Sequence, residues 1–278
     1  MPVLISPADL AEALASATPP VVLDVRWQLT ASGAPPYDGR AAYRTGHVPG
    51  AVFVDLDQEL AAHGAPSEGR HPLPSVEDLQ ASARRWGVRD DSTVVAYDGF
   101  GNLAAARAWW LLRWAGVRDV RLLDGALPGW TDAGGELATG EASPEPGDVT
   151  LAPGALPTLD VDTVNSFAGV LLDARATERY RGETEPVDPK AGHIPGATSA
   201  PTADNLDADG RFLPAADLRA RFERLGVSDR GSTAAYCGSG VTAAHEVAAL
   251  AIAGFEAALY PGSWSQWSNL DLPVATGD

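Results

Sequence analysis

The sequence predicts an α/β protein made of two copies of one domain, each a mainly parallel sheet flanked by helices. Short β-prone runs alternate with helical runs, which is typical of parallel sheets. The same motifs also occur twice in the same order, as when Gly46-His-Val-Pro-Gly-Ala51 returns as Gly192-His-Ile-Pro-Gly-Ala197. A chain of 278 residues is long enough for two domains of ordinary size.

The first half supplies the alternation most clearly. Ser75 precedes a helical run with capping-type chemistry, and Trp86-Gly87 ends that run. Runs rich in valine and leucine between turn residues read as buried strands. The expected strands are 21–25, 51–54, 93–97 and 120–123, and the expected helices are 75–86 and 103–114.

The second half repeats this text, so the domain bounds follow from the repeat. Val22-Leu-Asp-Val-Arg26 returns as Leu171-Leu-Asp-Ala-Arg175. We therefore predict one domain over residues 1–140 and another over 158–278. Residues 141–157 are rich in Pro, Gly and Ala with little periodicity, and we expect an ordered or extended linker there.

The loop that begins at Cys237 is the main candidate site. Cys237 is the only cysteine, and it ends a β-prone run. Gly238 and Gly240 allow a tight turn, and Thr242 is expected to cap the helix over 243–253. The amide groups of such a loop surround the sulfur at a positive helix end, which favours the thiolate and would hold a persulfide or an oxyanion.

Two other interpretations of Cys237 are less well supported by the sequence. A lone cysteine is commonly a buried structural residue, but the flanking glycines favour a nucleophile that a substrate approaches. A protein phosphatase needs an arginine that closes the loop around phosphate. Ala243 and Ala244 stand there instead, so phosphate chemistry is not expected.

The repeat also provides an internal control, because the first half has Asp98 where the second half has Cys237. An aspartate cannot accept sulfur, so we assign catalysis to the second half. His47 and His193 are equivalent residues of the two copies. Because the copy without the cysteine also has this histidine, we expect each of them to stabilise the fold.

Bulk composition limits the partners. The net charge is −17 and the sequence pI is about 4.5, which argues against nucleic acid and anionic membranes. An anionic substrate would need local arginines. We see neither a signal peptide nor a transmembrane span, since apolar runs such as 247–255 are too short. A single cysteine excludes an internal disulfide and fits a cytoplasmic protein.

Three long motifs, together with the Cys237 loop, resemble the two-domain rhodanese family and in particular its 3-mercaptopyruvate sulfurtransferase branch. They are Leu172-Asp-Ala-Arg-Ala-Thr-Glu-Arg-Tyr-Arg-Gly182, Gly192-His-Ile-Pro-Gly196 and Tyr260-Pro-Gly-Ser-Trp-Ser-Gln-Trp267. The resemblance covers nearly the whole chain. It implies tandem rhodanese domains with the active site between them, and transfer of sulfur through a cysteine persulfide.

Site residues follow from the same resemblance. Cys237 matches the nucleophile of the family. Its cradle would be Gly238, Gly240, Val241 and Thr242. The thiosulfate branch typically has an arginine and a lysine after this cysteine, whereas this chain has Gly238 and Ser239.

The mercaptopyruvate branch implies a relay and a binding site for the donor carboxylate. Ser239 resembles a member of a Ser-His-Asp relay, with His71 and Asp57 from the first half. Arg179 matches the arginine that binds the carboxylate. A second arginine of the family has no clear counterpart, and Lys190 is the candidate to replace it.

The function we expect is transfer of a sulfane sulfur from 3-mercaptopyruvate, through a Cys237 persulfide, to cyanide or a thiol, either a small thiol or a thioredoxin-like protein. One alternative is a thiosulfate sulfurtransferase with cyanide as acceptor. A further alternative is a non-catalytic redox or scaffold protein. We expect no cofactor, metal, nucleic acid or membrane partner.

Overall fold

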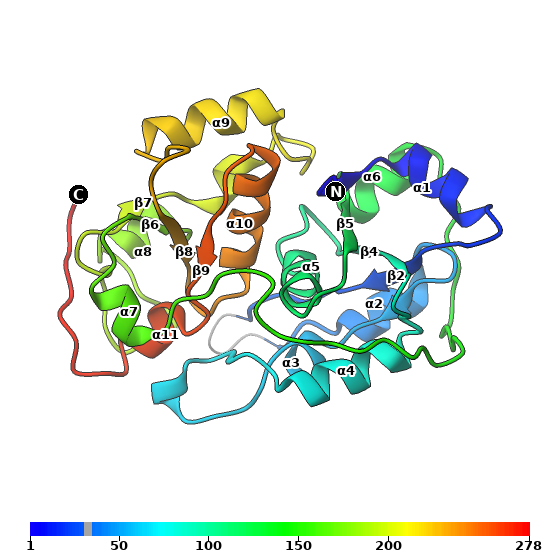
Figure 1. Cartoon of the computed structure of the whole chain (residues 1–278), viewed down its shortest axis with the longest axis horizontal. Coiled ribbons are helices and arrows are strands. Elements are labelled where there is room, and N and C mark those ends of the chain that lie inside the picture. The colour runs from blue at the N-terminus through cyan, green and yellow to red at the C-terminus, as the bar shows by residue number, and fades with distance from the viewer. Residues whose placement is uncertain (31–34) are drawn as a thin grey trace.

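The structure is a computed structural model that describes residues 1–30 and 35–278. It has one sheet in each half of the chain, and the two halves lie side by side (Figure 1). The first sheet has the order β1-β5-β4-β2-β3 and the second β7-β6-β8-β9, with parallel pairing throughout. This confirms the predicted fold class. The strands are β1 (Leu4–Ile5), β2 (Val21–Asp24), β3 (Val52–Phe53), β4 (Thr93–Tyr97), β5 (Asp119–Leu123), β6 (Val170–Asp173), β7 (Thr198–Ser199), β8 (Thr233–Tyr236) and β9 (Ala258–Leu259).

Helices join successive strands. The α-helices are α1 (Pro7–Leu14), α2 (Gly39–Thr45), α3 (Leu56–Glu59), α4 (Val76–Arg85), α5 (Ala105–Trp114), α6 (Ala126–Asp132), α7 (Val161–Asn165), α8 (Thr177–Tyr180), α9 (Ala215–Arg224), α10 (Thr242–Ile252) and α11 (Ser263–Trp267). Two 3-10 helices are η1 (Pro66–Glu68) and η2 (Thr202–Asn205). Both sheets lie within the predicted domains, whose bounds stay a prediction.

One local expectation is wrong, and one strand is absent from the predicted set. Thr242 does not cap α10, because it is the first residue of that helix and the preceding Val241 makes no side-chain capping bond. The edge strand β1 was also missed, because two residues are too few to show an alternating pattern. It pairs with β5 and gives the first sheet five strands, whereas the second sheet has four.

The two halves meet along equivalent helices. α5 packs on β4 and β5, α10 packs on β8 and β9, and the two helices pack against each other. Both helices are buried over most of their length, so they join the halves through one continuous hydrophobic core. The interface between the halves is therefore a packed interior that can hold side chains in fixed positions.

The linker region, residues 141–157, lies along the first half. The amide of Gly147 donates to the carbonyl of Arg84 at 2.7 Å, and the amide of Ala152 donates to the carbonyl of Ala115 at 3.0 Å. Gly147 has no room for a side chain, since a Cβ would lie 1.9 Å from the carbonyl oxygen of Val88. Between the two sheets the chain is thus tied down by backbone hydrogen bonds.

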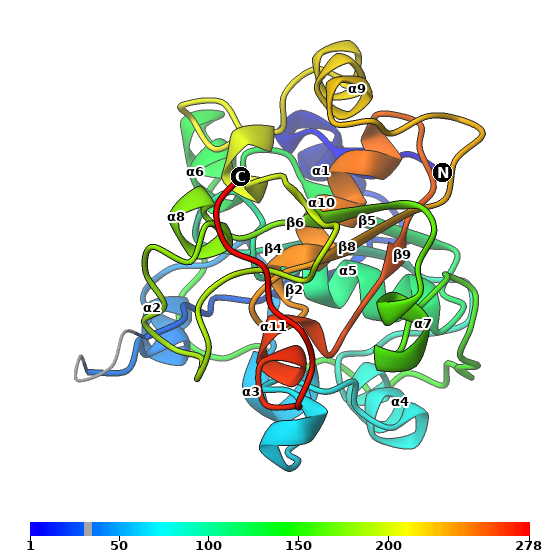
Figure 2. The same cartoon turned by 90° about the vertical axis from the view of Figure 1, so that its left-hand side faces the viewer.

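His47 and His193 occupy equivalent places in the two halves. The Nδ1 of His47 donates to the carbonyl of Tyr43 at 2.9 Å, and the Nδ1 of His193 donates to the carbonyl of Tyr180 at 2.8 Å. Each imidazole ring also stacks on the tyrosine whose carbonyl it contacts, Tyr43 for His47 and Tyr180 for His193. The C-terminal segment runs along the outside of the second half (Figure 2), where Ala275 pairs with His193. These contacts connect each histidine to the fold in the same way.

Asp98 fills the loop that corresponds to the cysteine loop. Its carboxylate accepts four backbone hydrogen bonds of 2.8–3.2 Å and is buried. Burial raises the pKa of Asp98 to about 6, although the four amides favour the charged form. The donors are the amides of Phe100, Asn102, Ala104 and Ala105. A side-chain anion thus occupies the amide cradle of the first half.

Removal of this carboxylate should destabilise the fold. Asp98→Ala is expected to lower the free energy of unfolding by roughly 2–4 kcal/mol, because the amides that it accepts from are left buried without an acceptor. Urea unfolding monitored by circular dichroism measures the effect. Asp98→Asn keeps one acceptor oxygen and should lose less, and the exposed Asp91→Ala serves as the control. Equal stability of Asp98→Ala and wild type would contradict this structural role.

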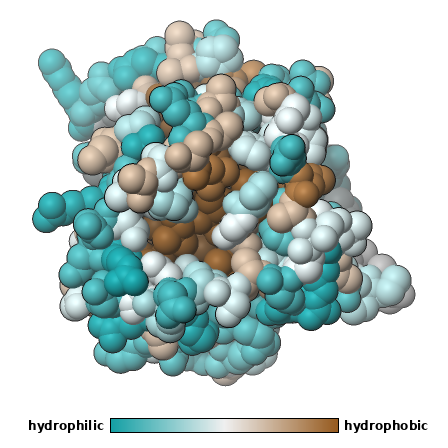
Figure 3. Space-filling model, turned by 90° about the vertical axis from the view of Figure 1, so that its right-hand side faces the viewer, coloured by the Kyte–Doolittle hydropathy of each residue, from teal (hydrophilic) through white to brown (hydrophobic). Residues whose placement is uncertain are grey.

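Much of the outer surface is hydrophilic. On the face that carries the first half, hydrophobic side chains gather in a central hollow within a hydrophilic rim (Figure 3). Across the described residues, every helix is too short or too polar to cross a bilayer.

Candidate active site

Cys237 lies at the junction of the two halves, directly after β8 and before α10. Only 1% of the residue is exposed, but it lines a cavity of about 550 Å³. Residues from both halves form the cavity wall. They include Trp27, Arg70 and Leu103 from the first half, and Arg175, Arg179, Gly238, Ser239, Val241 and Thr242 from the second. A small molecule in this cavity would lie against the sulfur atom.

The cysteine loop is shaped by backbone contacts. The amide of Gly240 donates to the sulfur of Cys237 at 3.1 Å. Gly240 has a φ of 78°, and a Cβ there would lie 2.5 Å from the carbonyl oxygen of Pro261. Only glycine therefore fits this position. The amide of Cys237 donates to the hydroxyl of Ser263, at the start of α11, at 3.1 Å. The loop is held from both sides of the sulfur.

Ser239, His71 and Asp57 are brought together across the interface. The Oγ of Ser239 lies 2.7 Å from Nδ1 of His71, and Nε2 of His71 lies 3.3 Å from Oδ1 of Asp57. A carboxylate only accepts hydrogen bonds, so Nε2 carries the proton and Nδ1 accepts from the Ser239 hydroxyl. The three side chains form a continuous chain of hydrogen-bonding groups beside Cys237.

The charges along this chain are set by burial and pairing. Burial lowers the pKa of His71 below its ordinary value of 6.5, and the hydrogen bond to Asp57 opposes this shift in part. That same hydrogen bond lowers the pKa of Asp57. At neutral pH the pair is therefore a neutral imidazole and a carboxylate. The Asp57 side chain is 48% exposed, which allows its end of the chain to exchange protons with water.

Trp27 supports this arrangement, and nothing in the sequence pointed to it. Its indole Nε1 donates to both oxygens of Asp57, at 3.0 and 3.1 Å. Its ring meets the ring of His71 edge to face at 5.4 Å. The indole thus orients both His71 and Asp57, and it also lines the cavity.

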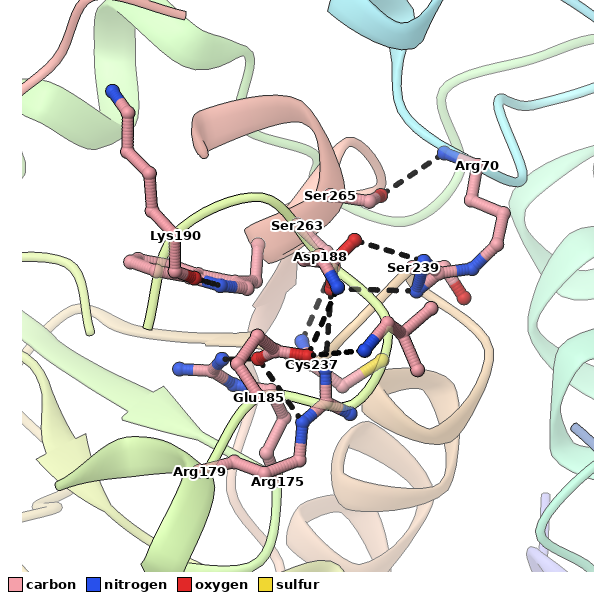
Figure 4. Close-up of polar contacts among 12 residues, drawn as sticks. Arg70, Arg175, Arg179, Glu185, Asp188, Lys190, Cys237, Ser239, Ser263 and Ser265 are labelled. Atoms are coloured by element: carbon pink, nitrogen blue, oxygen red, sulfur yellow. Dashed lines mark hydrogen bonds and ion pairs between the residues drawn. The ribbon is translucent and has the colours of Figure 1, made fainter. Parts of the chain in front are cut away.

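Arg179, to which the family resemblance gives a role in donor binding, lies in the cavity wall, and its guanidinium is paired with two carboxylates. Its guanidinium donates to Glu185 at 2.7 Å and to Asp188 at 3.1 Å (Figure 4). Both carboxylates are almost fully buried. The guanidinium is thereby fixed with one edge toward Gly238, since a Cβ on that glycine would lie 3.4 Å from its Nη1.

Lys190 is not part of the cavity, contrary to the expectation. Its ammonium donates to the carbonyl of Leu270 at 2.7 Å, and its side chain points away from Cys237 (Figure 4). Arg70 lies in the cavity wall instead and donates to Asp188 at 2.8 Å. Arg70 directly precedes His71 in sequence, but only the packing of the two halves brings it to this site.

Arg107 of α5 is a second residue that the sequence did not single out. It is fully buried and donates to the carbonyls of Gly240 and His71, at 3.2 and 2.9 Å. Burial lowers its pKa to about 10. Within residues 1–30 and 35–278, the hydrogen bonds of the Arg107 guanidinium all go to backbone carbonyls. Its positive charge therefore lies between the cysteine loop and the His71 segment, and it fixes their spacing.

The two tryptophans near the loop belong to the core. Trp264 and Trp267 are fully buried in a hydrophobic cluster and do not line the cavity. Both side chains therefore serve core packing.

Comparisons with known proteins agree with this geometry. A sequence profile described as the rhodanese-like domain matches residues 6–133 and 160–270. A Mycobacterium tuberculosis protein with the inferred name thiosulfate sulfurtransferase SseB is 48% identical over 96% of this chain and 94% of its own. A Pseudomonas aeruginosa protein with the inferred name 3-mercaptopyruvate sulfurtransferase is also 48% identical, over 93% of each chain.

A solved structure shows the same likeness. The crystal structure of SseA from Escherichia coli, titled as a 3-mercaptopyruvate sulfotransferase with the rhodanese fold, superposes with a TM-score of 0.81. It shares 31% identity and covers 95% of this chain and 99% of SseA. Relatives of equal identity carry different donor names, so overall similarity does not select a donor.

Proposed function

The chain belongs to the rhodanese family, and from this premise we propose that it is a sulfurtransferase that takes sulfur from 3-mercaptopyruvate. A persulfide forms on Cys237, and its outer sulfur passes to a thiol, on a small molecule or a thioredoxin-like protein, or to cyanide. Sulfur donor and acceptor are both substrates, so the reaction needs two successive transfers at one sulfur atom.

The first transfer moves one sulfur atom from the donor to Cys237, and its atoms and electrons balance without a cofactor. The thiolate of Cys237 attacks the sulfur of the donor, and the carbon–sulfur bond breaks with its electron pair going to carbon. The enolate that leaves needs a proton at that carbon. The thiol proton of the donor supplies it by way of Ser239 and His71, and the products are pyruvate and a persulfide anion.

The observation that carries the choice of donor is the hydrogen bond of 2.7 Å between Ser239 and His71, next to the sulfur. Mercaptopyruvate leaves as an enolate and uses such a proton relay. Thiosulfate leaves as sulfite, which needs no proton at carbon. A relay built from two halves of the chain therefore favours mercaptopyruvate.

Thiosulfate is the second candidate, and one observation favours it. The guanidinium groups of Arg70 and Arg179 both lie near Gly238, where two positive charges suit a dianion. Asp188 contacts both guanidiniums and reduces this attraction. For this reason we rank thiosulfate second.

A direct comparison of the two donors tests the proposal. Purified protein is treated with each donor, the gain of about 32 Da on Cys237 is followed by mass spectrometry, and kcat/KM is measured with one common acceptor. We expect the persulfide and a higher kcat/KM with mercaptopyruvate. A higher kcat/KM with thiosulfate would reverse the donor assignment. Absence of any sulfur adduct would leave the redox or scaffold alternative.

A further inference from the structure

Two guanidinium groups from opposite halves converge beside Cys237. Arg179 comes from α8, and Arg70 follows η1 in the first half. A Cβ placed on Gly238 would lie 3.4 Å from Nη1 of Arg179 and 3.5 Å from Nη2 of Arg70. An anionic group that enters the cavity above Gly238 would therefore contact both arginines.

Asp188 lies between these two arginines (Figure 4). Its Oδ1 accepts from Arg70 at 2.8 Å, and its Oδ2 accepts from Arg179 at 3.1 Å. Its side chain is 3% exposed, and its amide donates to Glu185 at 3.0 Å. A buried carboxylate in this position holds both guanidiniums in place and cancels one of their positive charges.

The charge of the whole cluster follows from its ion pairs. Arg175 pairs with Asp173 at 2.6 Å, and Glu185 pairs with Arg179 at 2.7 Å. With Arg70 and Asp188 included, each guanidinium is matched by one carboxylate. The cluster is neutral when all of these groups are ionised. A sulfur donor that enters the cavity therefore meets N–H groups that can donate hydrogen bonds, but no large net positive charge.

Arg70 retains capacity to bind a ligand. Its side chain is 25% exposed, and it lines the cavity. Its Nε is buried, and no acceptor for it lies among residues 1–30 and 35–278. The backbone of Arg70 is fixed, because its amide donates to the hydroxyl of Ser265 at 3.0 Å. The guanidinium is thus held at the cavity wall, and its Nη2 faces Gly238.

We propose, resting on the proposed function above, that Asp188 sets the preference between sulfur donors, and that it does so through Arg70 and Arg179, the two arginines that it joins. Because Asp188 cancels one positive charge, the site suits the single carboxylate of mercaptopyruvate better than the two charges of thiosulfate. Arg70 is a donor-binding residue in this scheme, and Asp188 is a positioning residue that acts through both arginines.

Asp188→Asn tests the charge argument, because it keeps the shape and removes one negative charge. The ratio of kcat/KM for thiosulfate to kcat/KM for mercaptopyruvate should rise by about tenfold. Arg70→Gln should raise the KM for both donors, and Arg70→Lys should recover part of the loss. The double variant Arg70→Gln with Asp188→Asn restores the net charge, so its ratio should return toward that of wild type.

Matched controls remove one charge from the same segment outside the cavity. Arg181→Gln and Glu183→Gln are exposed and should leave both donors unaffected. An unchanged donor ratio in Asp188→Asn, or an unchanged KM in Arg70→Gln, would overturn the inference alone, provided that wild type accepts sulfur. Should Asp188→Asn fail to fold, the two Arg70 variants decide the question. Wild type that takes sulfur from neither donor would overturn the proposed function itself.

Discussion

Cys237→Ser is expected to abolish sulfur transfer from both donors and to leave the fold intact. A hydroxyl is not ionised near neutral pH and is a far weaker nucleophile toward sulfur than a thiolate, so turnover should fall by roughly four or more powers of ten. Serine is close to cysteine in volume, and the amide of Gly240 can donate to its oxygen as it does to the sulfur. Intact-protein mass spectrometry after donor treatment should show no adduct of about 32 Da.

Sulfur transfer by Cys237→Ser would contradict a persulfide on this residue. Cys237 is the only cysteine in the chain, so no other thiol can replace it. Residual turnover near that of wild type would mean that sulfur moves directly from donor to acceptor within the cavity, without a covalent intermediate. Urea unfolding of Cys237→Ser should match that of wild type and thereby separate chemistry from stability.

Ser239→Ala is expected to slow the mercaptopyruvate reaction by about two to four powers of ten, the usual contribution of a general acid or base. The thiosulfate reaction should barely change, because sulfite needs no proton at carbon. Steady-state kinetics of the variant with each donor provide the measurement. The ratio of the two effects is more informative than either alone, since a general disturbance of the cysteine loop would slow both donors.

The same relay predicts a signature in the pH profile. His71 must be neutral to accept the Ser239 proton, and burial lowers its pKa below 6.5. The mercaptopyruvate rate should therefore be retained as pH falls to 6.5 and decline only below it, as Nδ1 becomes protonated. Ser239→Ala should lose the part of this acid limb that is specific to mercaptopyruvate, with the thiosulfate profile of the same variant as the reference. Equal losses for both donors, or a mercaptopyruvate-specific acid limb that persists in Ser239→Ala, would show that Ser239 only shapes the loop.

Local patterns in the sequence determined much of this protein. Strand β4 has the predicted bounds, strand β8 ends directly before Cys237 as predicted, and helix α5 begins within two residues of its predicted start. The repeat identified Asp98 as the counterpart of Cys237, and both follow equivalent strands. These features depend on neighbouring residues, since hydrophobic periodicity, glycine turns and strand ends are set by short stretches of chain.

Tertiary structure decided how the site is completed. His71 and Ser239 are 168 residues apart, and from the sequence only the resemblance to a family pairs them. No pattern in the residues predicted that Arg70 rather than Lys190 would face the cavity, that Arg107 would lie beneath it, or that Asp188 would join two arginines. Such contacts depend on how α5 and α10 pack the two halves together. A short stretch of sequence encodes its own backbone conformation, but it carries no local signal for the side chains that a distant segment will bring against it.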